Sequence, residues 1–226
     1  LAHRICSRKF LPEAQRFKIL EEMDDGLFGK MAVEDKARFI ATLYMEDLGD
    51  FIRENIDSGF GFSRYQEKIS VAASSFDRLY DMLSDEPSYI DDIILRIFSE
   101  RMVAYQPDIC GFSVPFPGNL YGALICGKYI KDNFPDCKTI LGGGYPNTEL
   151  RELTETRLFE FIDYVTIDDG ELPVLRILQY CDDESVTLQR TFCLDSGIVK
   201  YFELTEKEDF PHTETGVPDY SDLPLD

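Results

Sequence analysis

The sequence predicts an α/β fold, in which an all-helical amino-terminal region precedes an open parallel sheet and a carboxyl-terminal β-hairpin. Three observations predict it. Apolar residues recur at helical spacing through most of the first hundred residues. After Pro107, short apolar runs alternate with helical segments, which favours parallel strands joined by helices. Near the end, two β-rich runs flank a turn that contains glycine. The expected sheet is therefore a partial Rossmann-like sheet.

The helical region has a break and a stop signal that divide it. Gly59 and Gly61 interrupt the apolar stripe, and Pro87 ends the next stripe. Ser88 with Asp91 three residues later is a capping-box pattern, which predicts the start of another helix. Helices are expected over residues 33–56, 65–83 and 90–102, with a shorter one within 11–27 and no strand before Ile109.

The second half predicts three parallel strands. The run 109–114 is apolar and short, as in strands that are buried on both faces. The other strands are expected at 139–141 and 164–167. The helices between and after them are expected from Asn119, as a capping residue, to Ile130, from about Glu149 to Phe159, and from Pro173 to about Tyr180.

Two further segments follow the parallel strands. The runs 187–194 and 198–204 around Asp195-Ser196-Gly197 predict a hairpin. Beyond Lys207 the sequence is polar and rich in proline, as in an extended linker. The predicted organisation is a helical region at 1–105, an α/β domain at 106–184, a β-hairpin at 185–206 and, at 207–226, a linker toward a further domain.

The charge and composition exclude several classes of protein. A net charge of −20 argues against nucleic-acid binding, which depends on clustered lysine and arginine. The acidic composition is explained most simply by solubility, and the alternative explanation is an acidic surface that docks a basic partner. No apolar run reaches the roughly 20 residues that span a bilayer, so we expect a cytoplasmic protein without a membrane partner. The start at Leu1 is neither an initiating methionine nor a secretory leader, and we expect that residues precede it.

The cysteines and histidines predict no metal site and no catalytic residue in this chain. The six cysteines form no CxxC or CxxxCxxC motif, which zinc ribbons and local iron–sulfur clusters need. Cys110 and Cys126 are expected to be small buried hydrophobes in a reducing compartment. The two histidines, His3 and His212, belong to no metal-binding or hydrolase motif.

The candidate ligand-binding site lies where the parallel strands end, because open α/β sheets bind ligands outside the carboxyl ends of their strands. Ser113 ends the first strand and offers a hydroxyl, although such a serine more often bonds local backbone. Gly142, Gly143 and Gly144 exceed the single glycine that a tight turn needs, so both a turn and the close approach of a ligand remain open. Asp168 comes with Asp169 and Glu171 just before a helix; capping is their favoured role and acid–base chemistry the alternative.

Three phrases at this edge resemble the amino-terminal domain of cobalamin-binding-type radical S-adenosylmethionine proteins, often called Fe–S oxidoreductases. They are Gln106-Pro-Asp-Ile-Cys-Gly-Phe-Ser113, Thr139-Ile-Leu-Gly-Gly-Gly-Tyr145 and Asp163-Tyr-Val-Thr-Ile-Asp-Asp-Gly-Glu171. They correspond to the family's PDxVGxS, GGxH or GGxxP, and D-x-V-x-x-G-E-G-E. The resemblance covers residues 105 to 226, and the end of the chain is similar to the joint before the family's catalytic barrel.

The sequence also departs from the family pattern. The cluster-binding CxxxCxxC is absent and would lie beyond Asp226. The cobalamin-ligating DxHxxG is replaced by Gln66-Glu67-Lys68-Ile69-Ser70-Val71, and the SxL phrase by Ser113-Val114-Pro115. The family's first two strands are missing as well, and we expect them upstream of Leu1. Ligation of cobalamin by histidine is therefore not expected.

The resemblance implies a substrate- or corrinoid-presenting accessory domain of a radical S-adenosylmethionine Fe–S oxidoreductase. Its partners would be its own carboxyl-terminal radical S-adenosylmethionine domain and a small-molecule or peptide substrate. The [4Fe–4S] cluster and S-adenosylmethionine would belong to the full-length enzyme. The cofactor-binding residues would be Ser113, Gly142, Gly143, Gly144 and Asp168. The alternatives are a non-catalytic α/β protein-docking module and a flavodoxin-like flavin carrier.

Overall fold

The computed structural model describes residues 15–22, 32–62, 76–203, 211, 213–217 and 221. Two compact units divide the chain, Leu1–Phe62 and Ser63–Asp226, and each is treated by itself. This division falls earlier in the chain than the predicted end of the helical region at residue 105. The reason is that the later helices of that region pack with the sheet.

The first unit is helical, as the sequence predicts. It contains η1 (Gln15–Lys18), α2 (Ile19–Glu22) and α3 (Ala32–Asn55), which confirms both the short helix within 11–27 and the helix over 33–56. A small core joins the two parts, made by the buried residues Phe17, Leu20, Ile40 and Leu43. Apolar residues at helical spacing therefore form one buried stripe on α3.

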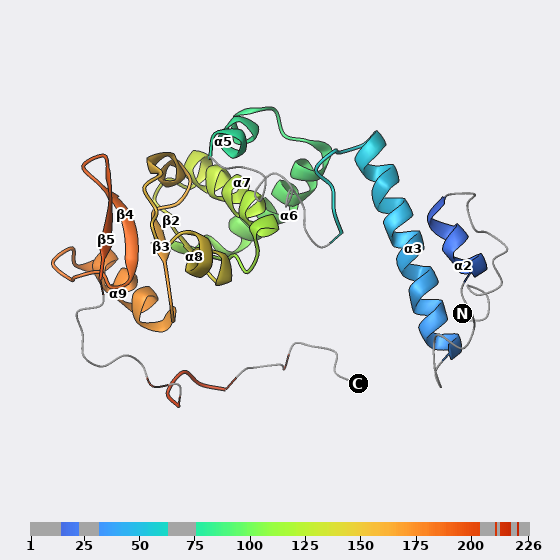
Figure 1. Ribbon diagram of the computed structural model, residues 1–226. Helices are drawn as coiled ribbons and strands as arrows, with labels where there is room; N and C mark the ends of the chain where they lie inside the picture. Colours follow the sequence, from blue (N-terminus) through green and yellow to red (C-terminus); the bar gives the residue numbers. More distant parts are fainter. Residues whose placement is uncertain are drawn as a thin grey trace. The chain divides into compact units, whose positions relative to one another are not determined.

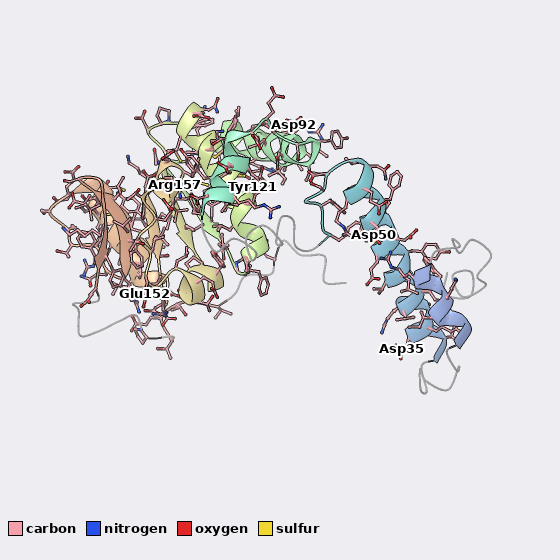
Figure 2. The ribbon with its side chains drawn as sticks, turned by 45° about the horizontal axis from the view of Figure 1, so that its top comes forward. Asp35, Asp50, Asp92, Tyr121, Glu152 and Arg157 are labelled. Carbon is pink, nitrogen blue, oxygen red and sulfur yellow. The ribbon has the colours of Figure 1, made fainter. Side chains whose placement is uncertain are left out.

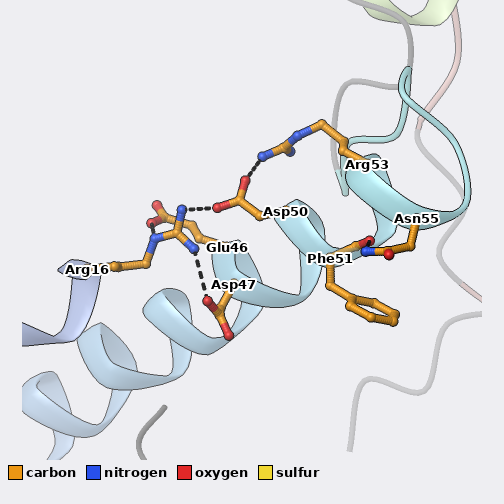
Figure 3. Close-up of polar contacts among 7 residues, drawn as sticks. All are labelled: Arg16, Glu46, Asp47, Asp50, Phe51, Arg53 and Asn55. Carbon is orange, nitrogen blue, oxygen red and sulfur yellow. Dashed lines mark hydrogen bonds and ion pairs between the residues drawn. The ribbon is translucent and has the colours of Figure 1, made fainter. Parts of the chain in front are cut away.

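An arginine joins η1 to the acidic side of α3. The guanidinium of Arg16 lies 3.2 Å from a carboxylate oxygen of Glu46 and 3.7 Å from one of Asp47, and it also bonds Asp50 (Figure 3). Asp50 in turn pairs with Arg53 one turn further along α3. These pairs offset part of the negative charge on the helix, although partly exposed pairs each contribute little to stability.

The second unit begins, in the described residues, with two helices. They are α5 (Asp77–Ser84) and α6 (Tyr89–Tyr105). Residues 63–75, the first part of the predicted helix over 65–83, lie outside the described residues. The capping box is confirmed: the Asp91 N–H donates to the Ser88 hydroxyl, and the Ser88 N–H donates to the Asp91 carboxylate.

Five strands form one mixed sheet in the order β1-β2-β3-β4-β5. Figure 1 labels β2, β3, β4 and β5 of this sheet. The strands are β1 (Ile109–Ser113), β2 (Lys138–Gly142), β3 (Tyr164–Thr166), β4 (Thr191–Asp195) and β5 (Ile198–Phe202). The first three are parallel, as predicted, and no strand precedes β1 among the described residues. The predicted hairpin is β4 and β5, and it continues the sheet because β4 pairs antiparallel with β3.

Helices cover both faces of the sheet. On one face α7 (Pro117–Asn133) packs Leu124 against Leu141 and Val165. On the other face α9 (Glu171–Asp182) packs Ile177 against Ile140 and Tyr164. Neighbouring residues of a strand point to opposite faces, so a strand contributes side chains to the packing on both faces of the sheet.

The start of α7 differs from the prediction. The helix begins at Pro117 with Phe116 as its N-cap, and no side chain caps it, so Asn119 is not the capping residue. Proline suits the first helical position because its fixed φ is preorganised and its missing N–H is not needed there. The apolar stripe of this helix is nevertheless buried as predicted, at Leu120, Ala123, Leu124, Gly127 and Ile130.

The predicted helix from Glu149 to Phe159 is wrong. A short helix, α8 (Gly144–Glu149), follows β2 directly, and the 3-10 helix η3 (Thr156–Glu160) precedes β3. Arg157 of η3, labelled in Figure 2, bonds Glu155 just before η3 and also makes long-range contacts. Its guanidinium lies over the rings of Phe76 and Tyr80 and bonds Asp77 at 2.8 Å. Tertiary contacts therefore override the helical pattern at this point.

The predicted burial of β1 on both faces is also wrong. Gly111 and Ser113 are exposed, and the other three residues are only half-buried. β1 pairs with β2 alone among the described strands, so it forms an edge of the sheet. Its apolar residues pack partly into two clusters: Phe112 contacts Phe98 of α6, and Ile109 packs against the cluster that contains Ile177 of α9.

None of the helices described, in either unit, combines the length and apolar character that crossing a membrane requires.

Candidate functional site

The turns that follow Ser113 and Gly142 lie side by side at the carboxyl end of the parallel strands. Ser113, exposed at the end of β1, is in register with Gly142 at the end of β2. The residues that follow β1 also contact the end of β2, because the Val114 N–H donates to the Gly142 carbonyl at 2.7 Å. The Tyr145 N–H then donates to the Val114 carbonyl at 2.9 Å. Backbone hydrogen bonds thus join the serine turn to the glycine turn.

The three glycines are needed for contacts within the chain. Gly143 has a φ of +103°, and a Cβ there would lie 2.8 Å from the Val114 nitrogen. A Cβ on Gly144 would lie 3.0 Å from the Pro115 carbonyl oxygen, and one on Gly142 would lie 2.8 Å from Thr166 Oγ1. Of the two explanations that the sequence leaves open, the tight turn is the one these distances favour.

The acidic turn after β3 joins the same edge through Asp168. This residue has a φ of +60°, and its N–H donates to the side-chain oxygen of Asn147 at 2.6 Å. Its carboxylate pairs with Arg151. A short polar side chain is well suited to this left-handed conformation, which explains an aspartate here.

The acidic residues do not cap α9 with their side chains. The N-cap is Gly170, and no side-chain cap hydrogen bond is made there. Glu171 occupies the first turn, where a carboxylate complements the helix dipole. Capping therefore does not account for Asp168, whose partner is Arg151.

Sequence reasoning placed the loop 142–147 at this edge without giving Asn147 a role, and it missed three further residues, Arg151, Arg190 and Tyr201. Asn147 and Arg151 belong to α8 and the turn after it, and they hold Asp168. Arg190 is buried just before β4, and its carbonyl accepts from the Ile167 N–H at 3.1 Å. Arg151 lies inside the helix predicted over 149–159, which concealed its role. Arg190 reaches this edge only because β4 pairs antiparallel with β3.

The last missed residue is Tyr201 of β5, and charged groups of the rim influence the pKa of its phenol. Partial burial is the main cause that raises the pKa of its phenol, and the carboxylates of Asp168 and Glu203 raise it further. Arg151 and Arg190 act in the opposite direction. Tyr201 pairs with Phe192 of β4, in the half of the hairpin that adjoins the carboxyl end of β3.

We call Ser113, Asn147, Arg151, Asp168 and Tyr201 the rim cluster. Its groups are two hydroxyls, an amide and an ion pair, which suit hydrogen bonding to a polar ligand. In the part of the chain that the structure describes, no three His, Cys, Asp or Glu side chains converge so as to hold a metal ion.

Of the two cysteines predicted to be buried hydrophobes, Cys126 of α7 is buried and Cys110 of β1 is only half-buried. Burial is the main cause that raises the pKa of Cys126 to about 12 and that of Cys110 to about 11. Cys6, His3 and His212 lie outside the described residues.

A corrinoid, which the resemblance admits, does not fit the glycine turn. Its flat ring would need open space over the glycines, but backbone atoms of Val114 and Pro115 lie within about 3 Å of the positions where Gly143 and Gly144 would carry a Cβ. The chain's own backbone therefore occupies the space that such a ring would need.

Comparison of the chain with protein-family models, with curated proteins and with solved structures gives no match in any of the three. The resemblance therefore rests on the three sequence phrases.

Proposed function

We propose that this chain is the substrate-presenting accessory domain of a radical S-adenosylmethionine Fe–S oxidoreductase. In this proposal the rim cluster holds a small-molecule or peptide substrate toward a separate catalytic barrel. The iron–sulfur cluster and S-adenosylmethionine belong to that barrel and supply the radical. The chain's own residues bind and orient.

One observation carries the proposal: the three phrases that resemble the family end on one edge of the sheet. Ser113 is in register with Gly142, and Asn147 behind the glycine turn bonds the N–H of Asp168 at 2.6 Å. Ligands of open α/β sheets bind at this edge. The ion pair of Arg151 with Asp168 and the phenol of Tyr201 add polar groups that would fix a ligand's orientation.

Equilibrium dialysis of the chain against the small-molecule fraction of a cell extract, followed by mass spectrometry, tests the rim. The wild type should retain at least one compound that the Ser113→Ala/Asp168→Asn double variant loses. Asparagine also tolerates a positive φ, so the second change removes charge with little strain. Ser99→Ala is the matched control, because Ser99 lies on α6 and only bonds the Arg96 carbonyl of its own helix.

Hydroxocobalamin and flavin mononucleotide serve as separate probes in the same equilibrium dialysis. We expect the protein to bind neither probe. If the wild type binds one of them and the rim variant does not, the ligand of the rim cluster is that cofactor and not a substrate. Iron, sulfide and S-adenosylmethionine added to this chain should give neither cluster absorbance nor methionine. A compound retained equally by the rim variant, or no retained compound at all, would overturn the proposal.

A second candidate is a protein-docking module without catalysis. The observation that favours it is the exposure of large apolar side chains on α6, where Val103 is 62% and Tyr105 is 72% exposed. Large apolar side chains exposed to solvent can mark a protein interface when they form one patch. The dialysis separates the two candidates, because a docking module retains no small molecule at the rim.

A further inference from the structure

A cavity of about 160 Å³ lies between α5, α6 and α7, and no residue of the sheet lines it. It is distinct from the rim cluster, with which it shares no lining residue. Its apolar walls come from all three helices, through Leu83 of α5, Leu95 of α6 and Ile125 of α7, with Tyr121 and Tyr129 beside them. An apolar protein cavity of about 150 Å³ is large enough to bind benzene. This one therefore suits a single six-membered ring.

The wall of the cavity also holds a fixed carboxylate. Asp91 is buried, and one of its oxygens accepts hydrogen bonds from the Tyr121 hydroxyl and from the Ser88 N–H, each at 2.9 Å. Figure 2 shows Tyr121, the buried donor from α7. The carboxylate is thereby held in place by two helices.

The charge of the lining is unbalanced. Two further carboxylates, Asp85 and Asp132, are exposed members of the lining, whereas Lys128 is its one basic residue. The Lys128 ammonium donates to the Leu83 carbonyl at 2.5 Å, in the last turn of α5. Its charge is thus engaged at a helix carboxyl end, where a cation is favourable. Three carboxylates and one ammonium make the lining complementary to a cation.

We propose that this cavity binds a small primary amine that is attached to a single apolar ring. The ring occupies the space between Leu83, Leu95 and Ile125. The ammonium lies at the carboxylate side, where it remains partly hydrated and gains the attraction of the acidic residues. A matched acid would meet the same carboxylates with the wrong sign, and a neutral alcohol would gain only the burial of its ring.

Isothermal titration calorimetry with three ligands of one shape tests this: 2-phenylethylamine, 2-phenylethanol and phenylacetate. The amine should bind about fivefold more tightly than the alcohol, the ratio expected of a partly exposed ion pair. Phenylacetate should bind most weakly. The Asp85→Asn/Asp132→Asn double variant should lower the affinity for the amine toward that for the alcohol and leave the alcohol unchanged. Asp136→Asn, an exposed position outside the lining, is the matched control.

Filling the cavity should abolish binding of both the amine and the alcohol. Leu95→Phe adds volume at a half-buried wall position, and Ile125→Phe does so at a buried one. Near-ultraviolet circular dichroism shows whether each variant folds. If one does not fold, the binding measured with the other variant tests the proposal. The proposal is overturned if the amine gives no binding heat, if phenylacetate binds equally well, or if a folded cavity-filling variant still binds the amine.

Discussion

Thr139 and Asp163 hold each other at the amino ends of β2 and β3 through reciprocal hydrogen bonds. The Asp163 N–H donates to the Thr139 hydroxyl at 2.9 Å, and the hydroxyl donates to the Asp163 carboxylate at 2.9 Å. The same carboxylate accepts from the Thr139 N–H at 2.7 Å and from the Lys131 ammonium at 2.6 Å. The aspartate that opens the third family-like phrase therefore lies at the edge opposite the rim and has a structural role.

Thr139→Val should lower the free energy of unfolding by about 1–2 kcal/mol, because it removes the two hydrogen bonds that the buried Thr139 hydroxyl makes with Asp163. Urea denaturation followed by circular dichroism measures the change. Thr148→Val is the control, since Thr148 is exposed and its hydroxyl bonds only carbonyls of its own helix. Equal losses in the two variants would contradict the assignment.

Two glycines of α7 should respond to alanine with opposite signs. Gly122→Ala should stabilise the protein by about 0.5–1 kcal/mol, because alanine favours the helix and no atom lies within 4 Å of the new Cβ. Gly127→Ala should destabilise by about 1–3 kcal/mol, since its Cβ would lie 2.6 Å from the Phe161 carbonyl oxygen. Thermal and urea unfolding of both variants tests the packing of α7 on the segment before β3. A stabilising Gly127→Ala would show that this close contact is absent.

Gly143→Ala should destabilise the protein by about 1–3 kcal/mol through a positive φ and a clash with the Val114 backbone. Gly197→Ala separates the two causes, because Gly197 also has a positive φ but has no atom near its Cβ position. We expect the Gly143 variant to lose more stability in urea. If both variants lose the same amount, the turn contact contributes nothing beyond conformation.

Ser88→Ala should lower stability by about 1 kcal/mol, the usual effect of removing a helix N-cap. The Ser88 hydroxyl accepts the Asp91 N–H at 3.1 Å, and that hydrogen bond is lost in the variant. Ser99→Ala, inside the same helix, should change little. Chemical denaturation of the two variants measures the difference, and a neutral Ser88→Ala would show that the cap is dispensable.

The buried thiols should make the protein less stable in alkali. Burial raises the pKa of Cys126 to about 12 in the folded protein, above its ordinary value near 9. The folded state therefore disfavours the thiolate, so this stabilisation is complete below about pH 9 and declines as the pH rises toward 12. Urea unfolding between pH 8 and 10.5 should show the decline, and Cys126→Ala should make it shallower.

Labelling with iodoacetamide gives an independent readout of the same burial. At pH 8 the exposed Cys181 should react in the native protein, whereas Cys126 should react only after unfolding. Peptide mass spectrometry resolves the two sites. Rapid native labelling of Cys126 would contradict its place in the core.

The sequence alone determined the features that depend on neighbours a few residues apart. The stripe of α3, the capping box of Ser88 with Asp91 and the turn at Ser196-Gly197 all follow from helical spacing or turn chemistry. The alternation of strands and helices also predicted three parallel strands and, with them, the common edge of Ser113 and Gly142.

Only the tertiary structure decided what lies beside these elements. The addition of β4 to β3 pairs Thr166 with Thr191, and it brings Arg190 and Tyr201 to the rim. Such pairing depends on the free energy of long-range contacts, which no local pattern encodes. The same reason applies to Gly143, because a glycine in the sequence signals conformational freedom but does not tell whether a ligand or the chain's own backbone occupies the space.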